Sequence, residues 1–266
     1  MSEPNKKFKI VTDTRARVIL PNALTLVGVC IGLSSINFAL NQNYKLAIIS
    51  IIFAAIIDGL DGRIARLIKG TSKVGKELDS LTDIISFGVA PAFIMYFWSL
   101  NTLGKIGWLI SLIYVVCIAL RLARFNLNSN NETSWKNNFF EGVPSPAGGV
   151  LVLSPLIYDV SELQILSLNY QIVVPIIFIF VSILLISKIP TYAFKKISVK
   201  RSTTVFLMFG IVFSFVLLLM FPFQTLVLVS LMYITSLPIS LYHYSKLKNL
   251  NKSEQLFDDD EPEDFL

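Results

Sequence analysis

Residues 58–83, DGLDGRIARLIKGTSKVGKELDSLTD, contain four aspartates, Asp58, Asp61, Asp79 and Asp83. Long apolar runs lie on both sides, IISIIFAAII before the stretch and IISFGVAPAFIMYFW after it. A charged side chain within a membrane-spanning segment costs about 3 kcal/mol or more, so acids placed there usually face a polar cavity and have a function. The stretch therefore predicts two membrane helices that share a polar site.

Each of the two helices carries its acidic residues on one face. On the first helix the i, i+3, i+4, i+7, i+8 spacing aligns five residues: Asp58, Asp61, Gly62, Ala65 and Arg66. On the second helix Gly75, Asp79 and Asp83 are four residues apart and share a face. Because only a short polar turn around 69–73 joins the helices, we expect the two faces to meet. The result would be a cluster of four carboxylates with an arginine beside it.

A cluster of four carboxylates predicts bound metal, because the acids would not all stay ionised without a cation. Hard oxygen ligands suit Mg²⁺ or Mn²⁺, and no Cys or His lies near enough in the sequence to indicate zinc. Two such ions flanked by carboxylates form the usual clamp for displacement at phosphorus. The alternative is a structural network of ion pairs, Asp58 with Arg66 and Asp79 with Lys76. The burial of four acids favours the metal site.

The stretch also fits the pattern D-x-x-D-G-x-x-A-R-x(8)-G-x(3)-D-x(3)-D at every fixed position. This pattern resembles the signature of the CDP-alcohol phosphatidyltransferases. The resemblance implies that the four aspartates hold two divalent cations and that Asp83 is also the general base. It further implies a group of residues that bind CDP-diacylglycerol, namely Gly62, Ala65, Arg66, Gly75, Asn22 and Thr25, the last two from the segment PNALT at 21–25. For Asn22, capping of a helix is an equal alternative.

Three further segments resemble the branch of this family in which L-serine is the acceptor. They are ISFGVAPA at 85–92, RLARFN at 121–126 and FEGVPSPAGG at 140–149. The resemblance implies that serine attacks CDP-diacylglycerol, which releases CMP and leaves phosphatidylserine. It covers roughly residues 20–155, and from residue 160 onward we find no identifying motif in the sequence.

Arg121 and Arg124 are three residues apart on one helix face, near its predicted cytoplasmic end. One interpretation is that both extend to lipid headgroups. The other is that they face the cavity, since a guanidinium suits bidentate binding of a carboxylate. In that case Arg121 or Arg124 would bind the carboxylate of serine, and Glu141 would bind its ammonium group.

The composition predicts the fold class. The chain of 266 residues is 54% hydrophobic and has a mean hydropathy of +0.66. These values are typical of an all-α, polytopic integral membrane protein and exclude a soluble domain. About eight transmembrane helices are predicted, at 19–40, 44–66, 74–98, 106–126, 146–160, 171–189, 203–221 and 224–243. An even number of spans places both termini on one side of the membrane.

The basic residues predict which side that is. If both termini are cytoplasmic, only Lys45 and Lys105 of the 23 lysines and arginines lie outside. By the positive-inside rule this distribution places the aspartate cluster on the cytoplasmic face of the cytoplasmic (inner) membrane. The basic residues then contact lipid headgroups, and membrane lipids rather than nucleic acid are the expected surroundings.

The chain divides into four predicted segments. Residues 1–18 form a basic interfacial segment, 19–160 the catalytic helices, 161–245 the C-terminal transmembrane helices, and 246–266 an acidic tail expected to be disordered. Within the third span, Gly88 and Pro91 are expected to loosen or kink the helix beyond the site. A homodimer is the assembly considered.

Two alternatives to the serine reaction remain open. The first keeps the chemistry and replaces serine by glycerol 3-phosphate, an inositol phosphate or choline. The second is a cation transporter with an acidic site in the membrane. Two features oppose transport: the acids lie toward the cytoplasmic ends of their helices, and the later spans contain no second acidic set.

Overall fold

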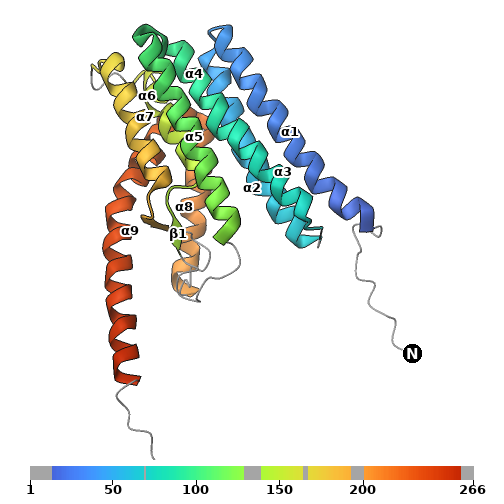
Figure 1. The fold of residues 1–266 in the computed structure, drawn as a ribbon, viewed down its shortest axis with the longest axis vertical. Helices are drawn as coiled ribbons and strands as arrows, with labels where there is room; N and C mark the ends of the chain where they lie inside the picture. The colour runs from blue at the N-terminus through green and yellow to red at the C-terminus, as the bar shows by residue number, and fades with distance from the viewer. Residues whose placement is uncertain (1–13, 69, 129–138, 164–166, 193–200, 259–266) are drawn as a thin grey trace, which may run out of the picture.

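The computed structural model describes residues 14–68, 70–128, 139–163, 167–192 and 201–258 (Figure 1). Its helices are α1 (Thr14–Leu40), α2 (Tyr44–Leu67), α3 (Lys73–Asp83), α4 (Ala90–Trp98), α5 (Lys105–Asn128), α6 (Ser145–Val160), α7 (Tyr170–Ile186), α8 (Arg201–Met220) and α9 (Pro222–Asp258). A π-helical turn, Ile84–Val89, joins α3 to α4, and a 3₁₀ turn, Leu100–Leu103, precedes α5. Two short strands, β1 (Phe139–Glu141) and β2 (Pro190–Tyr192), pair in antiparallel fashion with Phe140 opposite Thr191.

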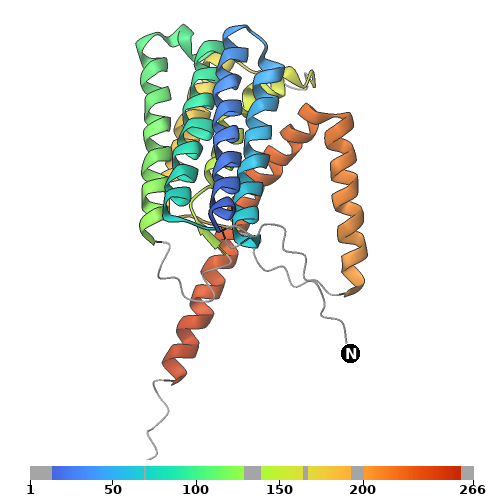
Figure 2. The same ribbon diagram turned by 90° about the vertical axis from the view of Figure 1, so that its right-hand side faces the viewer.

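The helices α1 to α7 form one bundle (Figure 1). Helix α1 packs against α2 and also against α3 and α4, whereas α6 lies among α2, α4, α7 and α9. Helix α8 stands away from the bundle and packs against α9, as Figure 2 shows. The bundle therefore places α2 and α3, which carry the aspartates, next to the first helix.

Helices lie at all eight predicted positions, the third being α3, the π-helical turn and α4 in succession. Within the described ranges, four helices are long and apolar enough to cross a membrane: Val18–Leu40, Lys73–Trp98, Lys105–Leu127 and Pro222–Ser245. Three apolar helices are shorter, and α2 carries charged residues along its second half. The all-helical membrane architecture is thus supported, while the number of crossings stays a prediction.

Aromatic side chains gather at the end of the bundle where α4 ends and where α5 and α7 begin. The rings of Trp98 and Tyr170 lie 4.9 Å apart, and those of Tyr96 and Trp108 lie 5.2 Å apart. Tryptophan and tyrosine are enriched at membrane–water interfaces, where their apolar rings and polar atoms are both satisfied. The aromatic residues therefore favour a membrane interface at this end of the bundle, and the aspartates lie away from it.

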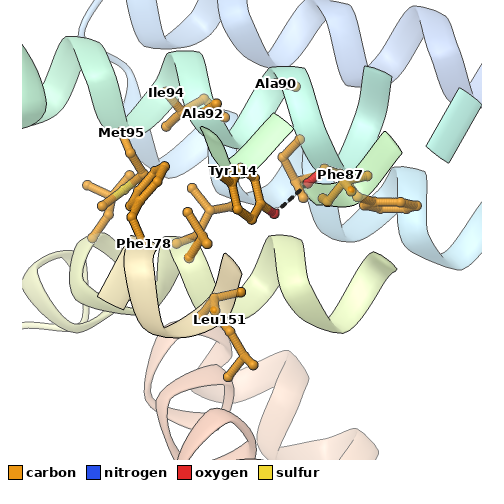
Figure 3. Packing of buried hydrophobic residues seen from close by; sticks show 14 of the residues in the cluster. Phe87, Ala90, Ala92, Ile94, Met95, Tyr114, Leu151 and Phe178 are labelled. Carbon is orange, nitrogen blue, oxygen red and sulfur yellow. Dashed lines mark hydrogen bonds between the residues drawn. The ribbon is translucent and has the colours of Figure 1, made fainter. Parts of the chain in front are cut away.

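The π-helical turn is explained by Pro91 and by the packing around Phe87. Proline has no N–H, so Pro91 cannot donate the usual helical hydrogen bond to the Phe87 carbonyl four residues earlier. The fully buried Tyr114 donates its hydroxyl to this carbonyl at 2.7 Å (Figure 3). On the other side, a Cβ at Gly149 would lie only 3.3 Å from the same oxygen. The predicted loosening of the third span is confirmed, and contacts from α5 and α6 hold the π-helical turn in place.

Two predicted segments differ from the structure or lie outside it. The predicted disordered tail begins at residue 246, yet the α9 backbone continues as helix to Asp258. The sequence from 246 to 258 contains Lys, Leu, Glu and Gln but no Gly or Pro, so an existing helix extends readily. Residues 259–266 and most of the predicted interfacial segment 1–18 lie outside the described residues.

Candidate active site

Helices α2 and α3 bring the predicted acidic residues together. One oxygen each from Asp58, Asp61 and Asp79 lies within 4.8 Å of the other two. The turn between the helices is closed by local hydrogen bonds: Gly70 N donates to Ala65 O at 2.8 Å, and Gly75 N donates to Ser72 Oγ at 2.9 Å. The short connection that the sequence predicted thus forms, and it orients the two acidic faces toward each other.

The fourth aspartate joins this cluster one helical turn beyond Asp79. The Asp58 carboxyl is in hydrogen-bonding contact with the carboxyls of both Asp79 and Asp83. The other Asp83 oxygen, Oδ1, is buried and has no hydrogen-bond partner in the described part of the chain. Carboxyl groups in contact need a shared proton or a cation between them. All four predicted ligands are therefore placed where a cation would relieve their repulsion.

The residues of the cluster fit a divalent metal ion by their chemistry. Their ligand atoms are all carboxylate oxygens, which Mg²⁺ and Mn²⁺ prefer. Asp61 is 3% exposed and accepts a 2.7 Å hydrogen bond from Thr25 Oγ1, which fixes its orientation. The alternative pairing of Asp58 with Arg66 is not formed in the described structure, because Arg66 Nε donates to the Gly62 carbonyl at 3.1 Å.

A cavity of about 690 Å³ opens beside the aspartates. Its lining includes Asp61, Asp79 and all of the residues predicted to bind the nucleotide-linked lipid: Asn22, Thr25, Gly62, Ala65, Arg66 and Gly75. Three basic side chains border it, Arg66, Lys73 and Lys76, and their charge complements a diphosphate. The volume lies within the usual range for cofactor and ligand sites.

The two glycines that line this cavity meet different structural requirements. A Cβ on Gly75 would lie 2.8 Å from Asn22 Oδ1, so α3 approaches α1 closely only because residue 75 is glycine. At Gly62 an added Cβ would meet no atom within 4 Å, so the missing side chain leaves open space. One glycine therefore serves helix packing and the other serves the width of the cavity.

The residues predicted to bind serine are separated by the structure. Arg121 is 8% exposed, and its Nη1 donates to Ser145 Oγ at 2.8 Å. Arg124 instead donates to the carbonyls of Ile186 at 2.7 Å and Ser187 at 3.2 Å, at the end of α7. Of the two arginines, Arg121 is the one that interacts electrostatically with Asp83 in the described structure. The Glu141 backbone is in β1, and its side chain lies outside the described residues, so its role stays a prediction.

Two residues near Arg121 were not among the predicted ones. Ser145 stands in the segment FEGVPSPAGG, of which only Glu141 was predicted to bind serine. The signal that could have found Ser145 is its position at the start of a helix, where serine often makes a polar contact. Tyr233, on α9, is also within electrostatic range of Arg121. No local motif marks Tyr233, so only the packing of α9 on the bundle could reveal it.

Comparison with known proteins identifies the class. The family model described as CDP-alcohol phosphatidyltransferase matches residues 18–179, which is more than half of the chain. The chain therefore belongs to the CDP-alcohol phosphatidyltransferase family. The match contains the aspartate cluster, the cavity and Arg121, and it favours enzymatic group transfer over the cation transport considered above.

Three curated relatives carry the same protein name, CDP-diacylglycerol–serine O-phosphatidyltransferase. The protein from Mycobacterium leprae is 48% identical over 140 residues, which are 52% of this chain and 46% of that relative. The Helicobacter pylori protein (strain 26695) is 37% identical over 179 residues, 67% of this chain and 74% of the relative. The Bacillus subtilis protein is 34% identical over 178 residues, which are 66% of this chain and 92% of that relative. The chain thus spans about half the length of the mycobacterial relative.

Proposed function

We propose that this protein transfers a phosphatidyl group from CDP-diacylglycerol to L-serine, giving phosphatidylserine and CMP. The observation that carries the proposal is the cluster of four carboxylates beside a cavity of about 690 Å³, which Asp61 and Asp79 line. The names of the relatives support serine as the acceptor. The same chemistry with glycerol 3-phosphate, an inositol phosphate or choline is the alternative that the test below separates.

In this proposal the cavity binds the CDP part of the donor. Arg66 contacts the phosphates, while Gly62, Ala65 and Gly75 leave room for the nucleotide. Asn22 and Thr25 line the α1 side of the cavity, where Thr25 also holds Asp61 in place. The acyl chains extend into the surrounding lipid, because the outer faces of the helices expose aliphatic side chains such as Leu26 and Val116.

Asp58, Asp61, Asp79 and Asp83 would hold two divalent cations, Mg²⁺ or Mn²⁺. When bound, such ions neutralise the diphosphate and stabilise the charge that develops on the departing CMP. The contacts of Asp58 with both Asp79 and Asp83 favour ligands shared between neighbouring positions. Thr25 contributes by keeping one Asp61 oxygen in a fixed direction through its hydrogen bond.

Asp83 is the proposed general base. The serine hydroxyl oxygen forms a bond to the phosphorus of the phosphatidyl group as the bond from that phosphorus to the CMP oxygen breaks. The hydroxyl proton passes to Asp83, whose Oδ1 is free of other hydrogen bonds within the described structure. An ordinary aspartate is a weak base for an alcohol, so close positioning of the hydroxyl is essential. Arg121, which interacts electrostatically with Asp83, would bind the serine carboxylate.

The proposed location is the cytoplasmic membrane, with eight crossings, both termini inside and the active site facing the cytoplasm. The support is the distribution of basic residues, since only Lys45 and Lys105 would lie outside. Lys45 forms an ion pair at 3.5 Å with Glu162, at the end of the bundle that carries the aromatic residues. A homodimer is the proposed assembly.

The test is an acceptor panel with the purified full-length protein. CMP release from CDP-diacylglycerol is measured with serine, glycerol 3-phosphate, inositol 1-phosphate or choline supplied separately, and the lipid product is identified. Phosphatidylserine should dominate. Turnover of another alcohol without turnover of serine would overturn the choice of acceptor, and absence of CMP release with all four would overturn the reaction itself.

A further inference from the structure

Three buried side-chain atoms have no hydrogen-bond partner in the described part of the chain: Asp83 Oδ1, Arg121 Nε and the Tyr233 hydroxyl. They come from three separate helices, α3, α5 and α9. Asp83 and Tyr233 each interact electrostatically with Arg121, so Arg121 is the group that the other two have in common. Unpartnered buried polar atoms are destabilising, and their presence on Arg121 and on two groups that interact with it indicates a ligand that supplies the missing hydrogen bonds.

Neighbouring contacts hold these groups in place without satisfying them. Ser145, 1% exposed at the start of α6, accepts the hydrogen bond from Arg121 Nη1 and leaves Nε unpartnered. Thr191 stands beside the Tyr233 hydroxyl, but it donates its own proton to the Gly142 carbonyl at 2.9 Å. Another residue of α9, Ser240, donates to the Pro190 carbonyl at 2.7 Å. The arginine and the tyrosine are therefore fixed by the fold before any ligand arrives.

Helix α9 presents Tyr233 to the bundle for a simple geometric reason. Ser230, Leu237 and Ser240 are buried on the same helix, and they lie three, four and seven residues from Tyr233, a spacing that defines one face. That face packs against α6 and β2. Tyr233 thus reaches Arg121 from outside residues 18–179, the part of the chain that matches the family.

The unpartnered atoms match the polar groups of a small hydroxy acid. Arg121 Nε–H and the Tyr233 hydroxyl are donors, which suit a carboxylate. Asp83 Oδ1 is an acceptor, which suits a hydroxyl group. An acceptor alcohol without an anionic group, such as choline, would leave the two donors unpartnered.

We infer that Tyr233 is a specificity-determining residue, which binds the carboxylate of the acceptor together with Arg121 and so selects a hydroxy amino acid over a plain alcohol. The inference rests on the proposed function in taking L-serine as that acceptor. It assigns a role in the reaction to the C-terminal helices, in which the sequence shows no motif.

The test uses Tyr233→Phe in the purified full-length protein, with CMP release measured over a range of serine concentrations. The KM for serine should rise about tenfold or more, because a buried carboxylate loses one charge-assisted hydrogen bond. The KM for CDP-diacylglycerol should stay unchanged. Tyr242→Phe is the matched control, since Tyr242 lies on the same helix and is 75% exposed; its serine KM should equal that of the wild type.

A second acceptor separates binding from a structural role. L-Serinamide keeps the hydroxyl and the amino group but lacks the carboxylate, so Tyr233→Phe should not raise its KM. Within the described residues the hydroxyl of Tyr233 has no hydrogen-bond partner, so its removal should also leave the melting temperature of the protein without acceptor unchanged. An equal rise in KM for serine and serinamide, or a lower melting temperature, would show a structural role and overturn the inference.

The remaining outcomes distinguish this inference from the proposed function. If the wild type makes phosphatidylserine but Tyr233→Phe keeps the wild-type KM for serine, the role of Tyr233 is wrong and the proposed function stands. If the wild type uses a different alcohol and not serine, the proposed acceptor fails first, in an experiment that contains no variant. The inference about carboxylate binding is then overturned with it.

Discussion

Replacement of Asp58 by asparagine tests whether the acidic cluster is a metal site. Asp58 is the member that contacts both Asp79 and Asp83, so its loss affects the whole cluster. Asparagine keeps the size of the side chain and removes its charge. The expected effects on stability and on activity have opposite signs, which a purely structural role of Asp58 would not produce.

The magnitude of the stability effect follows from the distances. Carboxylates within 4.8 Å of one another repel by about 3 kcal/mol per pair at an effective dielectric constant near 20. Protons shared within the cluster reduce this repulsion, so we expect Asp58→Asn to stabilise the metal-free protein by about 1–3 kcal/mol. Loss of one ligand should nevertheless lower the rate about a thousandfold, which corresponds to about 4 kcal/mol of transition-state stabilisation.

The assay combines melting curves with CMP release, each in EDTA and in excess Mg²⁺ or Mn²⁺. The wild type should melt at a higher temperature with the ion, since a ligand at a hundred times its Kd adds about 2.7 kcal/mol. Asp58→Asn should gain much less from the ion. Glu77→Gln is the control on α3, because Glu77 is exposed and was not placed in the cluster. Full wild-type activity in EDTA, or a less stable Asp58→Asn protein in EDTA, would refute the reasoning.

Three further perturbations test other parts of the structure. Gly75→Ala should raise the KM for CDP-diacylglycerol about tenfold, because the new Cβ would lie 2.8 Å from the Asn22 side-chain oxygen at the cavity. Gly59→Ala is the control and should leave this KM unchanged, since a Cβ there would meet no atom within 4 Å. Equal KM values for the two variants would contradict this reading of the cavity. Tyr114→Phe should lower the free energy of unfolding by about 1–3 kcal/mol, because the carbonyl at the π-helical turn loses its 2.7 Å hydrogen bond; an unchanged melting temperature would refute this role. In a cysteine-free background, a cysteine at Thr71 should react with an impermeant thiol reagent only from the cytoplasm and one at Asn101 only from outside, and the reverse pattern would invert the topology.

The acidic residues of the site were predictable because their geometry is local. Residues three or four apart share a face of any helix, and a turn as short as 68–72 leaves two helices little choice but to lie side by side. The positions of Asp58, Asp61, Asp79 and Asp83 therefore followed from spacing once both segments were helical. The cost of burying charge then indicated a common purpose for them.

The two arginines show where local spacing stops being informative. Arg121 and Arg124 share a helix face, and the sequence offered equal reasons for either one to bind a carboxylate. Arg124 reaches the end of α7, whose last carbonyls lack helical partners and accept its hydrogen bonds. Arg121 meets Ser145 and the acidic cluster instead. The difference arises from which helix lies opposite each side chain, a property of the packed bundle.

The sequence by itself determined the membrane character, the acidic faces of α2 and α3, and the small residues that line the cavity, because each depends on composition or on helical spacing. The tertiary structure alone decided the contacts of Arg121, the π-helical turn secured by Tyr114, and the approach of Tyr233 to Arg121. Arg121 and Tyr233 are 112 residues apart in the chain. No pattern within one helix can report that these two residues interact, because the interaction exists only when α9 packs against the bundle.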